Sequence, residues 1–193
     1  NEFIEEVMAS MPEMPNQKKE RFFTEFNLSE YDASLLAADK DLADFFEEVA
    51  KVSNSPKLSA NWIMGELSAE LNKENLSINE SKISSNKLGQ LILRIEDGTI
   101  SGKIAKEIFE KLWSSDNEVD EIIQSEGLEQ VTDDKEIESI IDEVINNNPE
   151  QLEQYRSGKD RLFGFFVGQV MKASQGKANP KQVNDILRKK LEK

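Results

Sequence analysis

The stretch Leu162-Phe-Gly-Phe-Phe-Val-Gly-Gln-Val-Met-Lys-Ala-Ser-Gln-Gly-Lys-Ala-Asn-Pro180 decides the fold of the last third of this 193-residue chain. Its apolar residues recur with helical spacing. Gly176 suits the left-handed position that ends a helix, and Asn179-Pro180 offers a cap followed by a residue that needs no amide hydrogen. We therefore predict two helices, at about 161–174 and 180–191, joined by a rigid turn that carries Lys177.

Positive charge collects at this end of an otherwise acidic chain, whose net charge is −14. Residues 156–193 hold ten Lys or Arg against three acids, a net of +7, whereas 114–155 hold one Lys against fourteen acids, a net of −13. Such asymmetry is typical of a polyanion-binding or acidic-partner surface. The candidate binding residues, which we expect to face solvent near the turn and along the last helix, are Lys172, Lys177, Lys181, Arg188 and Lys189.

Two simpler interpretations of these cations stay open. Lys172 falls in the last turn of its helix, where a cation complements the helix dipole by a few tenths of a kcal/mol. Alternatively, the basic patch docks on the acidic segment 116–153 of the same molecule.

Gly164 and Gly168 lie four residues apart and so share one helix face. In a helix interior each costs about 1 kcal/mol relative to Ala. This cost indicates that another helix approaches closely there, or that a ligand backbone such as ribose-phosphate does.

Helical periodicity also dominates the rest of the chain, beginning with the short stripe Phe3–Met8. Ser29 is expected to start one long helix whose apolar stripe runs from Leu35 to Val49. Residues 114–117 read as a hinge. We predict an all-α fold: a multihelical domain over 1–120, then a small helical tail domain over 121–193.

A weak internal repeat relates two segments 78 residues apart. Gly98, Ser101 and Lys103 stand where Gly176, Asn179 and Lys181 stand in the second copy. Each copy reads as a helix, a Gly stop, a short step to a cap and a second helix. The likeness is either a duplicated helical hairpin or chance similarity of two such hairpins.

The composition excludes most catalytic chemistry. The chain has no Cys and no His, so it lacks disulfides, thiolate ligands and the usual proton shuttle. Its dense acids sit at helix starts, where capping and solvation explain them. We expect no catalytic residue, metal or cofactor in this chain. No apolar run is long enough to cross a membrane, and an intracellular location fits. The chain begins Asn1-Glu-Phe3, without Met, and is expected to be part of a longer protein.

Several motifs resemble one known family. Gly164-Phe-Phe-Val-Gly-Gln-Val-Met-Lys172, Gly176-Lys-Ala-Asn-Pro180 and Val183-Asn-Asp-Ile-Leu187 resemble the end of the B subunit of the bacterial aspartyl/glutamyl-tRNA amidotransferases. Upstream, Leu28-Ser-Glu-Tyr-Asp-Ala33 and Leu42-Ala-Asp-Phe-Phe-Glu-Glu-Val49 are similar to that family's helical region. The resemblance covers nearly the whole chain.

The resemblance implies a function that composition alone does not. In this cytoplasmic family, the B subunit joins an amidase A subunit and a small C subunit, and the complex amidates misacylated tRNA using glutamine, ATP and Mg²⁺. This chain would be the non-catalytic helical domain plus the YqeY-like tail, which hold the tRNA, whereas the full-length parent is a carbon–nitrogen ligase. The alternatives are a scaffold for the other subunits without tRNA contact, and an independent enzyme, which the lack of His and Cys disfavours.

Overall fold

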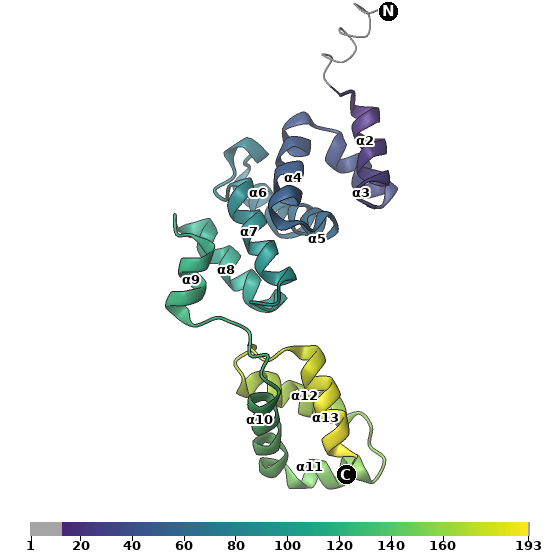
Figure 1. Ribbon diagram of the computed structural model, residues 1–193, viewed down its shortest axis with the longest axis vertical. Coiled ribbons are helices and arrows are strands. Elements are labelled where there is room, and N and C mark those ends of the chain that lie inside the picture. The colour runs from purple at the N-terminus through teal and green to yellow at the C-terminus, as the bar shows by residue number, and fades with distance from the viewer. Residues whose placement is uncertain (1–12, 193) are drawn as a thin grey trace, which may run out of the picture. The chain divides into compact units, whose positions relative to one another are not determined.

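The computed structural model describes residues 13–192, so the predicted stripe Phe3–Met8 lies outside the described residues. Figure 1 shows the chain as an assembly of helices. Within 13–192 there is no β-strand, only an isolated bridge between Val131 and Ala178. The predicted all-α class is confirmed. The chain divides into two compact units, Asn1–Glu96 and Asp97–Lys193.

The first unit is built from helices packed around aromatic and aliphatic side chains. The rings of Phe22 and Phe46 meet edge to face, 4.9 Å apart, and both side chains are fully buried. The helices of this unit are α2 (Pro15–Thr24), α3 (Glu30–Ala37), α4 (Lys40–Ser53), α5 (Pro56–Trp62), α6 (Ser68–Glu74) and α7 (Ser85–Glu96), with a π-helical turn at Ile63–Leu67 and a 3-10 turn at Ile78–Glu80.

The long helix expected from Ser29 is wrong, because the chain breaks it into α3 and α4. Ser29 does cap α3, its hydroxyl accepting from the Asp32 amide at 3.0 Å. Asp39 then caps a second helix by accepting from the Leu42 amide at 2.9 Å. The first amides of a helix have no carbonyl partner within that helix. An Asp side chain that accepts from one of them stabilises a helix start, so Asp39 begins α4.

The second unit contains the helices α8 (Gly102–Ser114), α9 (Val119–Glu126), α10 (Asp134–Asn147), α11 (Pro149–Arg156), α12 (Leu162–Ala173) and α13 (Pro180–Leu191). The two final helices match the predicted pair. The sequence did not predict α11, because Asn146-Asn-Asn-Pro149 reads as a break, yet proline fits the first position of a helix. The domain boundary expected after residue 120 lies within α9, and it stays a prediction about which segments fold independently.

The last four helices pack around one hydrophobic core. Phe166 and Val170 of α12 are fully buried against α10 and α13. The remaining buried members of this core are Ile137, Ile141, Val144, Ala178, Val183, Leu187 and Leu191. This core therefore holds one face of α12, one face of α13 and, through the buried Ala178, the turn between them.

Candidate nucleic-acid interface

The turn between α12 and α13 is built by local hydrogen bonds that the sequence encodes. The amide of Gly176 donates to the Met171 carbonyl at 2.7 Å, with φ of Gly176 at +78°. The Asn179 side chain accepts from the Lys181 and Gln182 amides at 3.0 and 3.2 Å. The predicted left-handed glycine and Asn-Pro cap are both confirmed.

A segment from far upstream fixes the same turn. The amide of Val131 donates to the Lys177 carbonyl at 2.7 Å, and the Val131 carbonyl accepts from the Asn179 amide at 3.2 Å. The Gln182 side-chain amide adds a bond to the Thr132 carbonyl at 3.0 Å. The backbone that carries Lys177 is therefore anchored from both sides, so its side chain projects from a defined position.

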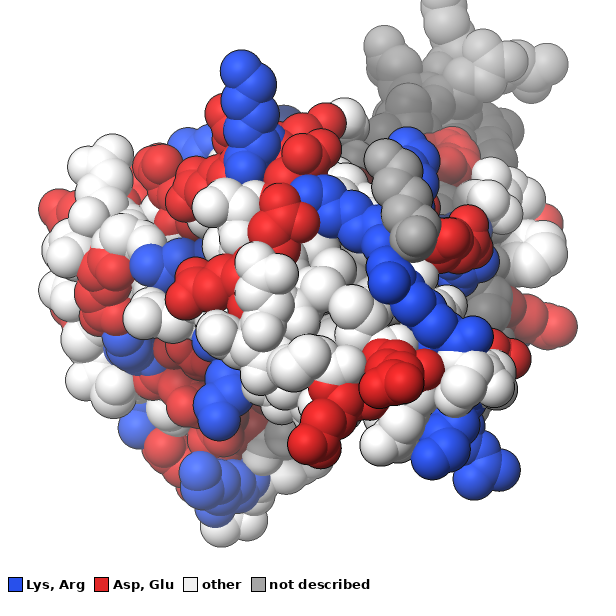
Figure 2. All heavy atoms as spheres, turned by 90° about the horizontal axis from the view of Figure 1, so that it is seen from below, with Lys and Arg blue, Asp and Glu red and all other residues white. Residues whose placement is uncertain are grey.

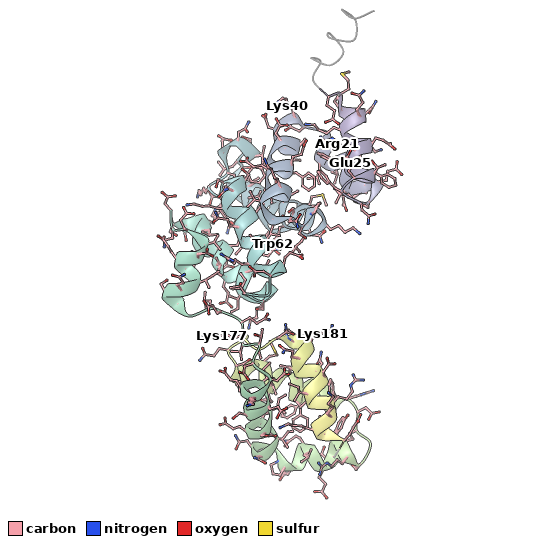
Figure 3. All side chains as sticks on the ribbon, viewed as in Figure 1. Arg21, Glu25, Lys40, Trp62, Lys177 and Lys181 are labelled. Atoms are coloured by element: carbon pink, nitrogen blue, oxygen red, sulfur yellow. The ribbon has the colours of Figure 1, made fainter. Side chains whose placement is uncertain are left out.

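The five predicted basic residues fall into two groups. Lys172 lies in the last turn of α12, Lys177 on the turn and Lys181 in the first turn of α13. Figure 3 shows Lys177 and Lys181 at the same end of the helix bundle. Arg188 and Lys189 follow Lys181 by about two helical turns, roughly 10 Å along the axis. The structure therefore gathers three of the five around the turn and places two toward the other end of α13.

Arg188 has a local partner that the sequence did not indicate. Its guanidinium carbon lies 5.3 Å from the centre of the Phe163 ring, a cation–π arrangement. This contact covers part of a half-buried aromatic side chain. Arg188 consequently has a packing role on α12 in addition to its charge.

The basic residues around the turn have no carboxylate partner in the described part of the chain. Within residues 13–192, the five predicted cations form no ion pair, whereas the neighbouring Lys190 pairs with Asp142 at 2.6 Å and Glu138 at 3.8 Å. The ion pairs between the basic helix α13 and the acidic helix α10 are therefore made by Lys190 and not by the five predicted residues. By contrast, Lys18 and Arg21 in the first unit are each paired with carboxylates.

Charge on the surface is otherwise mixed. Figure 2 shows acidic and basic side chains interspersed over the face that it draws. No face of a single sign is visible in that view. The net charge of a segment is therefore a poor guide to the potential at one spot, and the pairing of individual side chains matters more.

Sequence reasoning missed one basic residue near the turn. Lys103, in the first turn of α8, has its Cδ and Nζ atoms 3.5 and 3.6 Å from where a Cβ on Gly176 would lie. The Ser101 hydroxyl, which caps α8, also donates to the Gly176 carbonyl at 3.3 Å. The internal repeat carried the signal, because Lys103 occupies in the first copy the place of Lys181 in the second. Gly98 and Gly176 indeed share a φ of +78°.

The two glycines of α12 do not mediate helix packing in the part of the chain that the structure describes. Both are exposed, and a Cβ built on Gly164 or Gly168 would meet no atom within 4 Å. The expected close approach of another helix is therefore wrong for residues 13–192. The propensity cost of about 1 kcal/mol per glycine has no internal compensation here.

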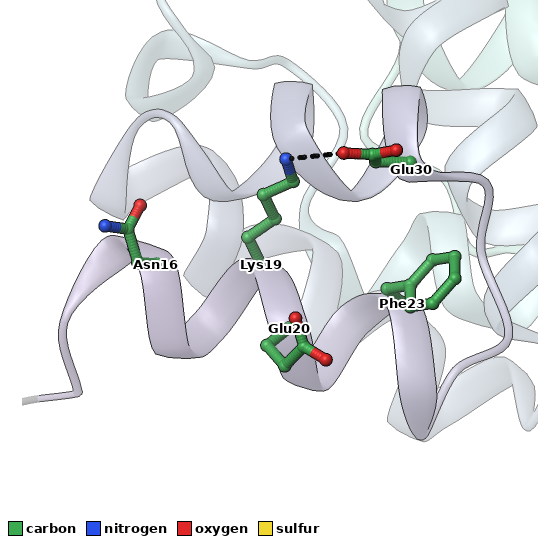
Figure 4. Close-up of a pocket in the computed structure, with 5 residues that line it drawn as sticks. All are labelled: Asn16, Lys19, Glu20, Phe23 and Glu30. Atoms are coloured by element: carbon green, nitrogen blue, oxygen red, sulfur yellow. Dashed lines mark hydrogen bonds and ion pairs between the residues drawn. The ribbon is translucent and has the colours of Figure 1, made fainter.

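A second surface of interest lies in the first unit. The exposed large apolar side chains among residues 13–192 are Met14, Phe23, Tyr31 and Leu35, all on or beside α2 and α3 and between 43% and 70% exposed. A hollow of about 460 Å³ beside these two helices is lined by Phe23 and by polar side chains, among them the Lys19–Glu30 ion pair of 3.3 Å (Figure 4). We call this region the α2–α3 apolar surface. Exposed large apolar side chains, where they form a patch, mark protein contacts.

The described residues offer little to a metal ion or a bilayer. No group of three or more Asp or Glu side chains in 13–192 is arranged to hold a metal ion. Among the helices in the same range, none combines the length and apolar character of a membrane span.

Fold and surface together define, for residues 13–192, an all-helical module with a small terminal helical bundle and cations without an ion-pair partner at one turn. A family model described as the GatB domain matches residues 44–191, and the chain belongs to this family. Proteins named as the B subunit of aspartyl/glutamyl-tRNA(Asn/Gln) amidotransferase are similar over 98% of the chain: 58% identical in Thioalkalivibrio sulfidiphilus, 56% in Ectopseudomonas mendocina and 53% in Coxiella burnetii. The chain spans about 40% of the length of these relatives.

Proposed function

We propose that this chain is the tRNA-holding, non-catalytic part of the B subunit of an aspartyl/glutamyl-tRNA amidotransferase. The observation that carries the proposal is the group of cations around the α12–α13 turn of an acidic protein, which form no ion pair with any residue that the structure describes. The names of the relatives supply the polyanion, a tRNA. In the parent complex the A and C subunits would be the partners, and ATP with Mg²⁺ would serve chemistry in the part that this chain does not include.

Lysines at these positions would touch phosphates and fix the position of the RNA without reading its bases. With about four phosphate contacts and a slope near 0.8 for each, affinity is expected to fall about 100-fold between roughly 50 and 200 mM salt. The arrangement suits such a role, because the anchored turn limits the entropy lost when its side chains meet a ligand.

The test is tRNA binding by the 193-residue chain carrying Lys177→Glu and Lys181→Glu. A matched control carries Lys57→Glu and Lys159→Glu, the same change of net charge at exposed lysines away from the turn. We expect the first variant to bind weakly and the control to bind nearly as the parent does. Equal binding by all three proteins would refute the proposal, and equal loss in both variants would reduce it to an effect of net charge.

The α2–α3 apolar surface favours a second function, a protein scaffold for the other subunits. Replacing Phe23 and Leu35 by Ser removes two exposed side chains, 47% and 43% exposed, without opening the core. In the full-length protein we expect this change to weaken co-purification with the A and C subunits while leaving tRNA binding by the 193-residue chain intact. If the variant co-purifies with the A and C subunits as well as the parent does, this surface does not serve as the scaffold.

A further inference from the structure

A hollow beside the α12–α13 turn combines an exposed glycine of α12 with two lysines that form no ion pair within residues 13–192. It measures about 340 Å³ and opens between α8 and α12 within the second unit. Its lining consists of Lys103, Gly168, Met171, Lys172, Gln175 and Gly176. The two lysines lie 69 residues apart in the sequence, on α8 and α12, so only the fold brings them to one place.

The glycines keep the hollow open. Gly168 lies in the interior of α12, and a Cβ there would point into space with no atom within 4 Å. Gly176 is buried and has the left-handed backbone that other residues rarely adopt, and Lys103 lies within ordinary contact distance of the place where its Cβ would be. A ligand can therefore reach the backbone of α12 at Gly168, within the hollow, because no side chain covers it there.

The electrostatics of the hollow favour an anion. Neither Lys103 nor Lys172 pairs with a carboxylate among the described residues, and both side chains are exposed. The last carbonyls of α12 are occupied, since those of Val170, Met171 and Lys172 accept from the three following amides. Two ammonium groups at one hollow repel each other unless an anion lies between them, and phosphate oxygens accept such charged hydrogen bonds well.

We propose that this hollow seats one phosphate group of an RNA backbone, with Lys103 and Lys172 donating to its oxygens and Gly168 allowing the sugar-phosphate chain to approach. The inference rests on the proposed function, and it extends the binding surface from the turn to α8. It also assigns a role to Gly168, one of the two exposed glycines of α12, which has no packing function within residues 13–192.

The charge test replaces Lys103 by Gln, with Lys103→Arg as the variant that keeps the charge. Loss of one phosphate contact lowers the slope of log affinity against log salt by about 0.8. The affinity ratio of parent to Lys103→Gln should therefore shrink about threefold between roughly 50 and 200 mM salt. Lys103→Arg should keep the parental slope. A parental slope in Lys103→Gln would overturn the inference.

The shape test compares Gly168→Leu, which fills the hollow, with Gly164→Leu one turn away. Both side chains would enter open space, so both proteins should fold, which circular dichroism checks. We expect only the first variant to lose tRNA affinity. If Gly168→Leu and Lys103→Gln both bind as the parent while Lys177→Glu with Lys181→Glu does not, the hollow is excluded and the proposed function stands. If that charge-reversed variant also binds normally, the proposed function fails as well.

A third experiment tests whether the hollow binds an RNA backbone or a free anion. Inorganic phosphate is titrated into the chain while the Gly168 amide is followed by NMR. Little change in that amide at millimolar phosphate, with a clear change on adding tRNA, supports the backbone seat. Saturation by phosphate alone, without tRNA affinity loss in Lys103→Gln, would assign the hollow to a small anion and overturn the inference.

Discussion

Gly89 is the position where a single added methyl group should do most harm to the first unit. This residue is buried in α7 where α7 packs on α4. A Cβ built there would lie 2.6 Å from Cβ of Val52, 2.8 Å from its Cγ1 and 3.2 Å from the Val49 carbonyl oxygen. Carbon atoms prefer separations of about 3.5–4.0 Å, so the two helices must move apart by about 1 Å or distort.

The magnitude follows from two opposing terms. Gly→Ala in a helix interior gains about 1 kcal/mol of propensity, whereas overpacking a tight site costs typically about 1–3 kcal/mol. The obstacles at Gly89 are a side-chain atom attached to the backbone and a backbone oxygen, which have little freedom to yield, so the cost falls near the upper end. We expect Gly89→Ala to destabilise the first unit by about 1–2 kcal/mol. For a unit of this size each kcal/mol lowers the melting temperature by about 4–8 °C.

The matched control is Gly164→Ala, the same substitution at an exposed helical glycine with open space around it. That variant should gain stability, by up to about 1 kcal/mol, because only the propensity term acts. Urea and thermal unfolding followed by far-ultraviolet circular dichroism measure both effects. A Gly89→Ala protein as stable as the parent, or a destabilised Gly164→Ala protein, would refute this reasoning.

Three further predictions concern other parts of the fold. Phe166→Ala should cost about 3–5 kcal/mol in urea unfolding, because the side chain is fully buried among α10, α12 and α13; a loss below about 1 kcal/mol would contradict that packing. Asn179→Ala should cost about 1 kcal/mol and speed hydrogen exchange in the first turn of α13, and unchanged exchange would argue against the cap. The hydrogen bond from Arg21 holds the pKa of the Glu13 carboxyl below its ordinary 4.5, so its stabilisation is present above that pH and is lost as the pH falls below it. Replacing Arg21 by Met should therefore reduce the loss of stability below about pH 4.5, and an unchanged acid profile would show that the pair contributes nothing.

The α12–α13 turn was predictable because each of its determinants is local. A glycine that ends a helix and an Asn-Pro step that starts one act through bonds within a few residues. The break between α3 and α4 follows the same logic, yet the apolar spacing across it suggested one continuous helix. The Asp39 cap was the competing signal, and it decided the outcome.

Glycines in helices show where local reasoning stops. Gly89 and Gly168 both sit inside helices, and their sequence contexts do not distinguish them. Only packing shows that the first lies against Val52 whereas the second faces open space. A close helix approach was expected at the second, while the structure has it at the first.

The amino-acid sequence by itself determined the helical class, the caps, the left-handed glycine and the concentration of cations near the end of the chain, because these depend on neighbours within one or two helical turns. Tertiary structure alone decided which cations remain unpaired. It joined Lys190 to the acids of α10 and carried Arg188 over an aromatic ring. It also brought Lys103 beside Gly176, since long-range packing between residues far apart in the chain leaves no periodic mark in the sequence.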